Sequence, residues 1–263
     1  MNAYLEAAAE AAREAGVFLR ENLGVSPEVS FKGEVDLVTD MDRRAQELIF
    51  RRIAKGFPEH DILAEEGLSR EKGSEFLWII DPLDGTTNYA HGFPIFTVSI
   101  ALARKGEVVC GVVHDPMRNE TFAAVKGEGA FCNGKKIGVS RVGELDKSLV
   151  ATGFPYDLRE SEENNIDHFN HFLTRVQAIR RCGSAAMDLC YVACGRFDGF
   201  WELKLMPWDV AAGALIVEEA GGRMSDFKGQ AFDIYGKETL ASNGLIHEQM
   251  IAVLGMGRRE AAE

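Results

Sequence analysis

The chain has 263 residues, of which 46% are hydrophobic and 27% charged, so it is long enough for a large buried core and has an ordinary globular composition. Its formal net charge of −12 argues against a protein that binds nucleic acid through Lys and Arg, and we expect no nucleic-acid partner. The five cysteines lack paired zinc spacing and favour a reduced, cytoplasmic protein. No uncharged run approaches the roughly 18 residues of a membrane helix, so we expect no membrane partner.

Grouped strands with two helices make up the first part of the chain. Residues 2–23 predict a long amphipathic helix, residues 29–39 a hairpin, and a second helix runs from residue 39 or 40 to residue 55. Asp42 falls in the first turn of that helix. Considered without other evidence, this residue is best interpreted as an exposed acid that complements the helix dipole. Strands are expected at 61–64, 76–80, 96–104, 107–114 and 121–125, followed by a loop at 127–134.

Short strands alternate with helices from residue 148 onward, which is the α/β pattern. The expected strands are 149–152, 178–181 and 200–203, and the expected helices lie within 160–176, 184–195 and 208–220. The sequence therefore divides into an α+β half, residues 1–147, and an α/β half, residues 148–263. Because no flexible linker separates them, we expect the two halves to pack tightly as one unit.

Two carboxylates stand at the end of the apolar strand that begins at Phe76. Pro82 removes a backbone donor, so we expect the strand to stop and the chain to turn at Asp81, with Asp84-Gly85 as a turn pair. Two ionised carboxylates held this close repel each other and call for a cation. Oxygen ligands of this kind suit Mg²⁺. An ordinary strand-to-helix turn with Asp as a cap is the alternative.

Two further acids lie at the ends of predicted elements. Glu65 follows a short strand beside Glu66, and because adjacent side chains at a strand end point in different directions, only one of them would face a shared site. An exposed acidic loop is the alternative there. Asp209 lies in the first turn of a helix, where capping is the alternative. The interpretation of Glu65 and Asp209 as cation ligands is favoured only if both side chains lie close to Asp81 and Asp84.

Residues 78–88, Trp-Ile-Ile-Asp-Pro-Leu-Asp-Gly-Thr-Thr-Asn, resemble the first signature of the inositol monophosphatase family. Residues 208–213, Trp-Asp-Val-Ala-Ala-Gly, with Glu-Ala-Gly-Gly at 219–222, resemble the second. The match extends over nearly the whole chain and is most similar to the bacterial inositol-1-monophosphatase branch. It implies a layered αβαβα sandwich of the sugar phosphatase type, which inositol monophosphatases share with fructose-1,6-bisphosphatases, and a homodimer.

The resemblance also implies roles for individual residues, with residues 1–147 as the metal-binding half and residues 148–263 as the substrate-binding half. It implies two Mg²⁺ ions, and a third that binds more weakly. The implied metal ligands are Glu65, Asp81, the Leu83 carbonyl, Asp84 and Asp209. The implied catalytic residues are Glu65, Thr86 and Asp42, the last two orienting the attacking water. The implied substrate-binding residues are Gly85, Thr86, Gly183, Ser184, Ala185 and Glu202.

The implied activity is that of an inositol-phosphate phosphatase, a lithium-sensitive hydrolase that converts myo-inositol monophosphate to inositol and phosphate by metal-activated water. The identity of the substrate's alcohol part stays undetermined, because the metal site does not contact the features that distinguish one alcohol from another. Fructose 1,6-bisphosphate, histidinol phosphate, NADP and 3′-phosphoadenosine nucleotides are alternative substrates on the same scaffold. A non-catalytic regulatory role is kept only as an addition, because none of the implied catalytic residues is missing.

Overall fold

Two β-sheets organise the structure, and the first contains the strand that carries the acidic motif. The computed structural model describes residues 3–24, 29–31 and 37–256. The first sheet has seven strands in sequence order, with β3 and β4 parallel and all other neighbours antiparallel. Its strands are β3 (Asp61–Ala64), β4 (Phe76–Asp84), β5 (Thr97–Arg104), β6 (Glu107–Asp115), β7 (Glu120–Val125), β8 (Gly129–Cys132) and β9 (Lys135–Lys136).

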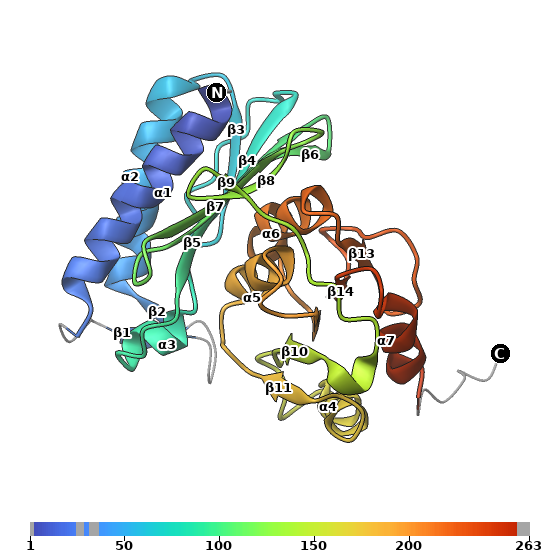
Figure 1. Cartoon of the computed structure of the whole chain (residues 1–263). Helices are drawn as coiled ribbons and strands as arrows, with labels where there is room; N and C mark the ends of the chain where they lie inside the picture. The colour runs from blue at the N-terminus through green and yellow to red at the C-terminus, as the bar shows by residue number, and fades with distance from the viewer. Residues whose placement is uncertain (1–2, 25–28, 32–36, 257–263) are drawn as a thin grey trace.

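Two long helices cover one face of this sheet (Figure 1). They are α1 (Ala3–Asn22) and α2 (Asp40–Gly56). Because side chains alternate along a strand, β4 sends Trp78 and Ile80 into the core beneath these helices and Ile79 into the core on the opposite face. The strand is therefore buried on both faces, as its run of bulky apolar residues predicts.

The second sheet is mixed and has five strands in the order β11-β10-β12-β14-β13. β10 pairs in parallel with β11 and β12, whereas β14 pairs antiparallel with β12 and β13. The strands are β10 (Leu149–Thr152), β11 (Ala178–Arg180), β12 (Gly199–Leu203), β13 (Arg223–Ser225) and β14 (Glu238–Ser242). Its parallel part agrees with the α/β pattern of the sequence.

Helices α5 and α6 form a layer between the two sheets, and α4 and α7 pack on the far face of the second sheet (Figure 1). The four helices are α4 (Ile166–Leu173), α5 (Ala185–Ala193), α6 (Pro207–Glu219) and α7 (His247–Leu254). A Cβ on Gly111 of β6 would lie 2.9 Å from the Ala212 carbonyl, so glycine lets α6 approach the first sheet closely. The layers follow one another as helix, sheet, helix, sheet, helix, which confirms the predicted αβαβα sandwich.

The end of β4 differs from the sequence prediction. Asp81 pairs with Ser99, and Asp84 pairs with Thr97, so β4 carries one extra residue in a β-bulge. Pro82 lies inside this bulge, where its missing donor is tolerated. The prediction that the strand stops before Pro82 was therefore wrong, and the chain turns only after Asp84.

Other differences concern short elements. The prediction of a loop at residues 127–134 was wrong. β8 pairs with β7, and the two-residue strand β9 pairs with β8. After residue 220 the sequence predicted no elements, whereas β13, β14 and α7 lie there. The predicted hairpin is present as β1 (Val29–Phe31) paired with β2 (Leu37–Thr39), and its expected turn at residues 32–34 lies outside the described residues.

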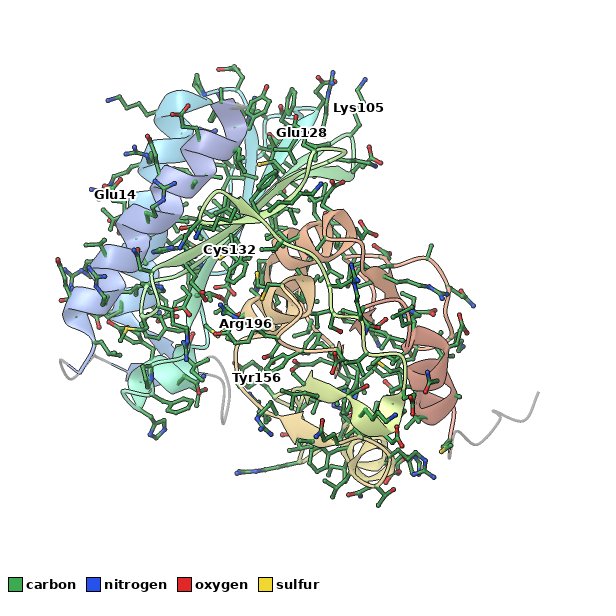
Figure 2. The ribbon with its side chains drawn as sticks, in the orientation of Figure 1. Glu14, Lys105, Glu128, Cys132, Tyr156 and Arg196 are labelled. Atoms are coloured by element: carbon green, nitrogen blue, oxygen red, sulfur yellow. The ribbon has the colours of Figure 1, made fainter. Side chains whose placement is uncertain are left out.

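Side chains join the two halves across the middle of the molecule. Arg196, labelled in Figure 2, follows α5. Its guanidinium forms a two-pronged ion pair with Glu120 at the start of β7. The Glu219 carboxylate at the end of α6 accepts hydrogen bonds from the backbone N–H groups of Gly127 and Gly129, both at 2.7 Å. The first sheet lies before residue 147 and the second after it, but the domain boundary itself stays a prediction. Within the part of the chain that the structure describes, no helix combines the length and apolarity needed to cross a bilayer.

Candidate active site

A short hydrogen-bonded chain joins α2 to the turn after β4, where α3 (Thr86–Ala90) begins. Thr86 Oγ1 lies 2.8 Å from Asp42 Oδ1 and 3.0 Å from the Leu83 carbonyl oxygen. Because a carbonyl and an ionised carboxylate can only accept, the Thr86 hydroxyl is the donor. Asp42 is fully buried, so the interpretation of this residue as an exposed acid at the helix terminus is wrong.

The turn after β4 lies against the loop that precedes α5. Gly85 has φ 98°, and a Cβ there would lie 3.0 Å from the Ile95 carbonyl oxygen and 3.1 Å from that of Gly183. Asn88 Nδ2 donates to the carbonyl oxygens of Ile95 and Cys182, both at 2.8 Å. Glycine at position 85 and the Asn88 amide therefore hold the acidic turn of the first half against the second half.

Asp84 accepts hydrogen bonds from the start of α5. Its Oδ2 receives the Ser184 hydroxyl at 2.6 Å, the Ala186 N–H at 2.8 Å and, more weakly, the Thr97 hydroxyl at 3.4 Å. Burial raises the pKa of Asp84, and the hydrogen bonds from Ser184 and the α5 backbone oppose that rise. A carboxylate of the first sheet thus binds the N-terminus of a helix in the second half.

Asp81 lies at the centre of a group of repelling charges. It is 1% exposed, and burial raises its pKa well above the ordinary value. The negative charges of Glu65, Asp84 and Asp209 raise this pKa further, whereas the Leu83 N–H, 2.9 Å from Oδ1, lowers it. We call the four carboxylic side chains of Glu65, Asp81, Asp84 and Asp209 the acid cluster.

Asp209 both caps α6 and belongs to the acid cluster. Its Oδ2 accepts the Met206 N–H at 2.7 Å, which closes the first turn of the helix and confirms the capping interpretation. Burial raises the pKa of Asp209 well above the ordinary value, and the charge of Asp84 raises it further. The charges of Glu65, Asp84 and Asp209 are therefore close enough to raise the pKa of Asp81, whereas the role of these acids as ligands of one cation site stays a prediction.

The acid cluster fits a hard cation by its chemistry. Its side chains offer only oxygen, and Asp81 and Asp209 have pKa values raised by burial and by mutual repulsion. A divalent cation would remove that repulsion. Among residues 3–24, 29–31 and 37–256, no three Asp, Glu, His or Cys side chains are already gathered into a group that could hold a metal ion.

A pocket of about 90 Å³ opens beside the acid cluster. Seven of the predicted site residues line it, namely Asp84, Gly85, Gly183, Ser184, Ala185, Glu202 and Asp209. The others are not part of its lining and connect to it through the hydrogen bonds and charges described above; these are Asp42, Glu65, Asp81, Leu83 and Thr86. The structure thus brings the predicted residues to one place, in two adjoining sets.

Glu202 on β12 is a buried acid in the wall of this pocket. Burial raises its pKa to about 8, an effect that the charge of Arg181 opposes and that of Asp188 strengthens. A Cβ on Gly153 would overlap the Glu202 carboxyl, so glycine at position 153 makes room for this acid. Near neutral pH the Glu202 carboxyl is mostly protonated and can donate a hydrogen bond as well as accept one.

Asp188 and Arg181 line the same pocket but received no role from the sequence. Asp188 lies in the interior of a predicted helix, where a polar residue is usually interpreted as surface. The available signal was its spacing, since residues four apart on a helix lie on the same side and Ser184 is four residues earlier. Asp188 is in fact 1% exposed.

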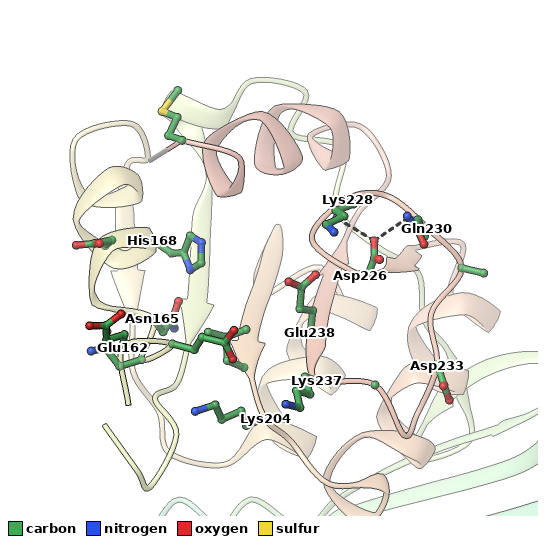
Figure 3. A pocket seen from close by; sticks show the side chains of 17 residues that line it. Glu162, Asn165, His168, Lys204, Asp226, Lys228, Gln230, Asp233, Lys237 and Glu238 are labelled. Carbon is green, nitrogen blue, oxygen red and sulfur yellow. Dashed lines mark hydrogen bonds between the residues drawn. The ribbon is translucent and has the colours of Figure 1, made fainter. Parts of the chain in front are cut away.

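A larger pocket of about 900 Å³ lies elsewhere, between α4, the end of β12 and residues 226–238. Figure 3 shows Lys204, Lys237 and Glu238 around it. None of the predicted site residues lines it. The smaller pocket is therefore the candidate active site, because it is the one that adjoins the acid cluster.

Comparisons with known proteins identify the family of this chain. A family model described as the inositol monophosphatase family matches residues 1–256. An inositol-1-monophosphatase from Synechocystis sp. is 43% identical over 256 residues, covering 97% of this chain and 89% of that protein. The Nus factor SuhB of Escherichia coli (strain K12) is 42% identical, covering 96% of each chain. The solved inositol monophosphatase structure from Anabaena (Nostoc) sp. PCC 7120 gives a TM-score of 0.87 at 42% identity, covering 95% of this chain and 94% of that one. The chain therefore belongs to the inositol monophosphatase family and is a phosphatase, as the resemblance predicted.

Proposed function

We propose that the enzyme is a Mg²⁺-dependent phosphomonoesterase that hydrolyses myo-inositol monophosphate to inositol and phosphate. The observation that carries this proposal is that the acid cluster lies beside a pocket lined by Glu202 and Ser184. A charged site for the phosphoryl group would therefore lie next to a hydrogen-bonding site for the alcohol. A solved structure described as SaIMPase-II with bound inositol monophosphate gives further support, with a TM-score of 0.78 and 26% identity over 94% of this chain.

The acid cluster and the Leu83 carbonyl would hold two Mg²⁺ ions, and a third would bind more weakly. Bound divalent cations supply neutralisation of the phosphoryl charge, acidification of a water molecule and stabilisation of the leaving oxygen. Two ions suit this reaction, because phosphate-monoester hydrolysis brings like charges together and is among the slowest uncatalysed reactions.

Thr86 and Asp42 would position the attacking water. With its proton donated to Asp42 Oδ1, the Thr86 hydroxyl oxygen keeps lone pairs that can accept a hydrogen bond from water. Glu65, which is close enough to influence the pKa of Asp81, would take the proton of that water. The backbone N–H groups of Gly85 and Thr86 would bind phosphate oxygens. The bond from water oxygen to phosphorus would form as the bond to the alcohol oxygen breaks, and the alkoxide would take up a proton from solvent to leave as the free alcohol.

The wall of the pocket would select the alcohol. Glu202, Ser184 and the backbone at Gly183 and Ala185 offer neutral donors and acceptors for ring hydroxyls. A polyol such as inositol can satisfy several of these groups at once, whereas an apolar alcohol would leave them without partners. Polar pockets reject ligands that lack a matching hydroxyl more strongly than apolar pockets reject small size differences.

Phosphate release from a panel of monoesters tests the proposal. The panel contains inositol 1-phosphate, fructose 1,6-bisphosphate, histidinol phosphate, NADP and a 3′-phosphoadenosine nucleotide, each with Mg²⁺ and with EDTA. We expect the highest kcat/KM for inositol 1-phosphate and no turnover in EDTA. A tenfold preference for another monoester would replace the substrate assignment, and full activity in EDTA would end the metal assignment.

Lithium should inhibit the enzyme at millimolar concentration, because Li⁺ competes for oxygen ligands that suit Mg²⁺. The measurement is the rate of phosphate release from inositol 1-phosphate at fixed Mg²⁺ with increasing LiCl. NaCl at matched ionic strength is the control. Undiminished activity in excess LiCl would argue against a second, lithium-accessible cation position.

Further parts of the proposal concern the setting of the enzyme. We propose a cytoplasmic homodimer, and the five cysteines, all free, suit a reducing compartment. Some relatives bear the name Nus factor SuhB, and a regulatory role of this chain would be an addition to its catalysis. Light scattering of the purified protein tests the dimer, and a pull-down with transcription components tests the added role.

A further inference from the structure

One buried oxygen in the candidate active site is left without a hydrogen-bond partner. Asp188 is 1% exposed, and within the described part of the chain its Oδ1 makes no hydrogen bond. Buried polar atoms in folded proteins nearly always have a partner, so an exception calls for an explanation. Asp188 also lines the small pocket, so this residue borders the space that a ligand would occupy.

The position of Asp188 is fixed by its surroundings. It lies on α5 one turn after Ser184, and its backbone N–H donates to the Ser184 carbonyl at 3.0 Å. Ser184 in turn donates its hydroxyl to Asp84. The thiol of Cys182 is close enough to the Asp188 carboxyl to lower its pKa.

The missing partner is best matched by a neutral group. Burial raises the pKa of Asp188 well above its ordinary value, and the charge of Asp84 adds to the rise. A carboxyl pairs well with a hydroxyl in either protonation state, because a hydroxyl can both donate and accept a hydrogen bond. The surrounding pocket belongs to the alcohol side of the proposed reaction, because Glu202 and Ala185 line it as well.

We infer that Asp188 is a specificity-determining residue whose carboxyl hydrogen-bonds a hydroxyl of the substrate's alcohol part. This inference rests on the proposed function, since it requires a hydroxylated alcohol beside the scissile phosphate. Phosphate esters of alcohols without a second hydroxyl gain nothing from this contact. Asp188 therefore separates polyol phosphates from simple aryl phosphates and takes no part in the cleavage of the phosphorus–oxygen bond.

Two substitutions and two substrates test the inference in the Mg²⁺-loaded enzyme. Asp188→Ala removes the oxygen, whereas Asp188→Asn keeps a carbonyl oxygen in a side chain of the same shape. We expect Asp188→Ala to lower kcat/KM for inositol 1-phosphate by about 10- to 100-fold and to change kcat/KM for p-nitrophenyl phosphate by less than about twofold. Asp188→Asn should recover most of the loss. An equal fall for both substrates, or no fall for either, would overturn the inference.

Monodeoxy analogues of inositol 1-phosphate identify the hydroxyl. The analogue that lacks the contacting hydroxyl should be a poor substrate of the wild type and should lose nothing more in Asp188→Ala, because the interaction is already absent. Further loss with every analogue would contradict the contact. Thermal melting of each variant controls for folding, and Asp188→Ser replaces Asp188→Ala if the alanine variant melts early.

The design separates this inference from the proposed function. If the wild type prefers another hydroxylated phosphate monoester, the substrate assignment fails on the wild-type panel alone. The Asp188→Ala effect is then measured on that preferred substrate against p-nitrophenyl phosphate. A selective loss there still supports the role of Asp188, and a uniform loss overturns it.

Discussion

Thr86 has one hydroxyl proton and two nearby acceptors, Asp42 Oδ1 and the Leu83 carbonyl oxygen. Both acceptors belong to the predicted site, one as an orienting acid and the other as a metal ligand. The hydroxyl would therefore connect the group proposed to position water with the group proposed to bind cations. Its loss should affect the chemical step more than substrate binding.

Thr86→Val tests this connection with a side chain of nearly the same shape. We expect kcat to fall by about 10²- to 10³-fold with KM changed by less than about threefold, because a group that acts only in the transition state is removed. Thr86→Ser keeps the hydroxyl and should retain most of the activity. Steady-state phosphate release measures both, and a purely KM effect would contradict the role of Thr86.

Asp84→Asn tests the acid cluster. We expect kcat to fall by more than about 10²-fold, because one charge that would hold a cation is lost. The fold should persist, since Asn keeps an oxygen for the Ser184 hydroxyl and the substitution removes a repelling buried charge. Thermal melting in EDTA measures this, with the exposed Asp146→Asn as control. A large loss of stability without metal would show that Asp84 is structural.

The sequence pattern predicted site residues by type and position, and seven of them line one pocket, but the pattern did not indicate their burial. From the sequence, the simplest interpretation of Asp42 is an exposed acid. In the structure it is 0% exposed and lies beside Thr86. Asp188 went unnoticed for the same reason. Whether a polar residue on a helix faces solvent or a pocket depends on which elements pack against it, and that information is not local to the sequence.

At the scale of elements, the ends of strands were harder to predict than the strands. The apolar run from Phe76 to Ile80 indicated β4 correctly, but the bulge that carries it through Pro82 to Asp84 depends on pairing with β5. β8 has only four residues and β9 only two, so β8 is a strand because β7 offers an edge to pair with, and β9 is a strand because β8 does. Periodicity cannot reveal elements that tertiary pairing creates.

Glu219 stabilises one such element. Its carboxylate accepts the N–H groups of Gly127 and Gly129 in the turn between β7 and β8. Glu219→Ala should lower the free energy of unfolding by about 1–3 kcal/mol, because two backbone donors lose their acceptor. The neighbouring residue Glu218 is exposed and provides the control. Glu218→Ala should change the free energy of unfolding by less than about 0.5 kcal/mol. Urea denaturation measures both, and equal effects would contradict the assignment.

At the scale of the whole molecule, buried acids and buried histidines give stability opposite pH dependences. Carboxyls with raised pKa values bind protons in the folded chain but not in the unfolded chain, so they make stability fall as pH rises. Glu202, with a pKa of about 8, extends this fall to pH 8. Burial lowers the pKa of His114 and of His247 from 6.5 to about 4, so these two histidines reduce stability only as pH falls below 6.5.

We therefore expect the free energy of unfolding in EDTA to fall between about pH 7 and pH 8, where the histidines are mostly neutral in both states, by up to about 1.4 kcal/mol per pH unit from Glu202 alone. Saturating Mg²⁺ should abolish or reverse this fall, because cations bind the ionised acid cluster of the folded chain. Urea denaturation at both pH values, with EDTA and with Mg²⁺, is the measurement. Stability that rises with pH in EDTA would refute the effect.

The hydrogen bonds that Asp84 accepts from Ser184 and Ala186 limit how this enzyme can be taken apart or recombined. A fragment beginning near residue 148 would present α5 without the acid that binds its first turn, and its pocket would lack a wall. Chimeras between relatives that aim to transplant substrate preference must therefore exchange the turn after β4 together with α5, although some hundred positions of sequence separate the two.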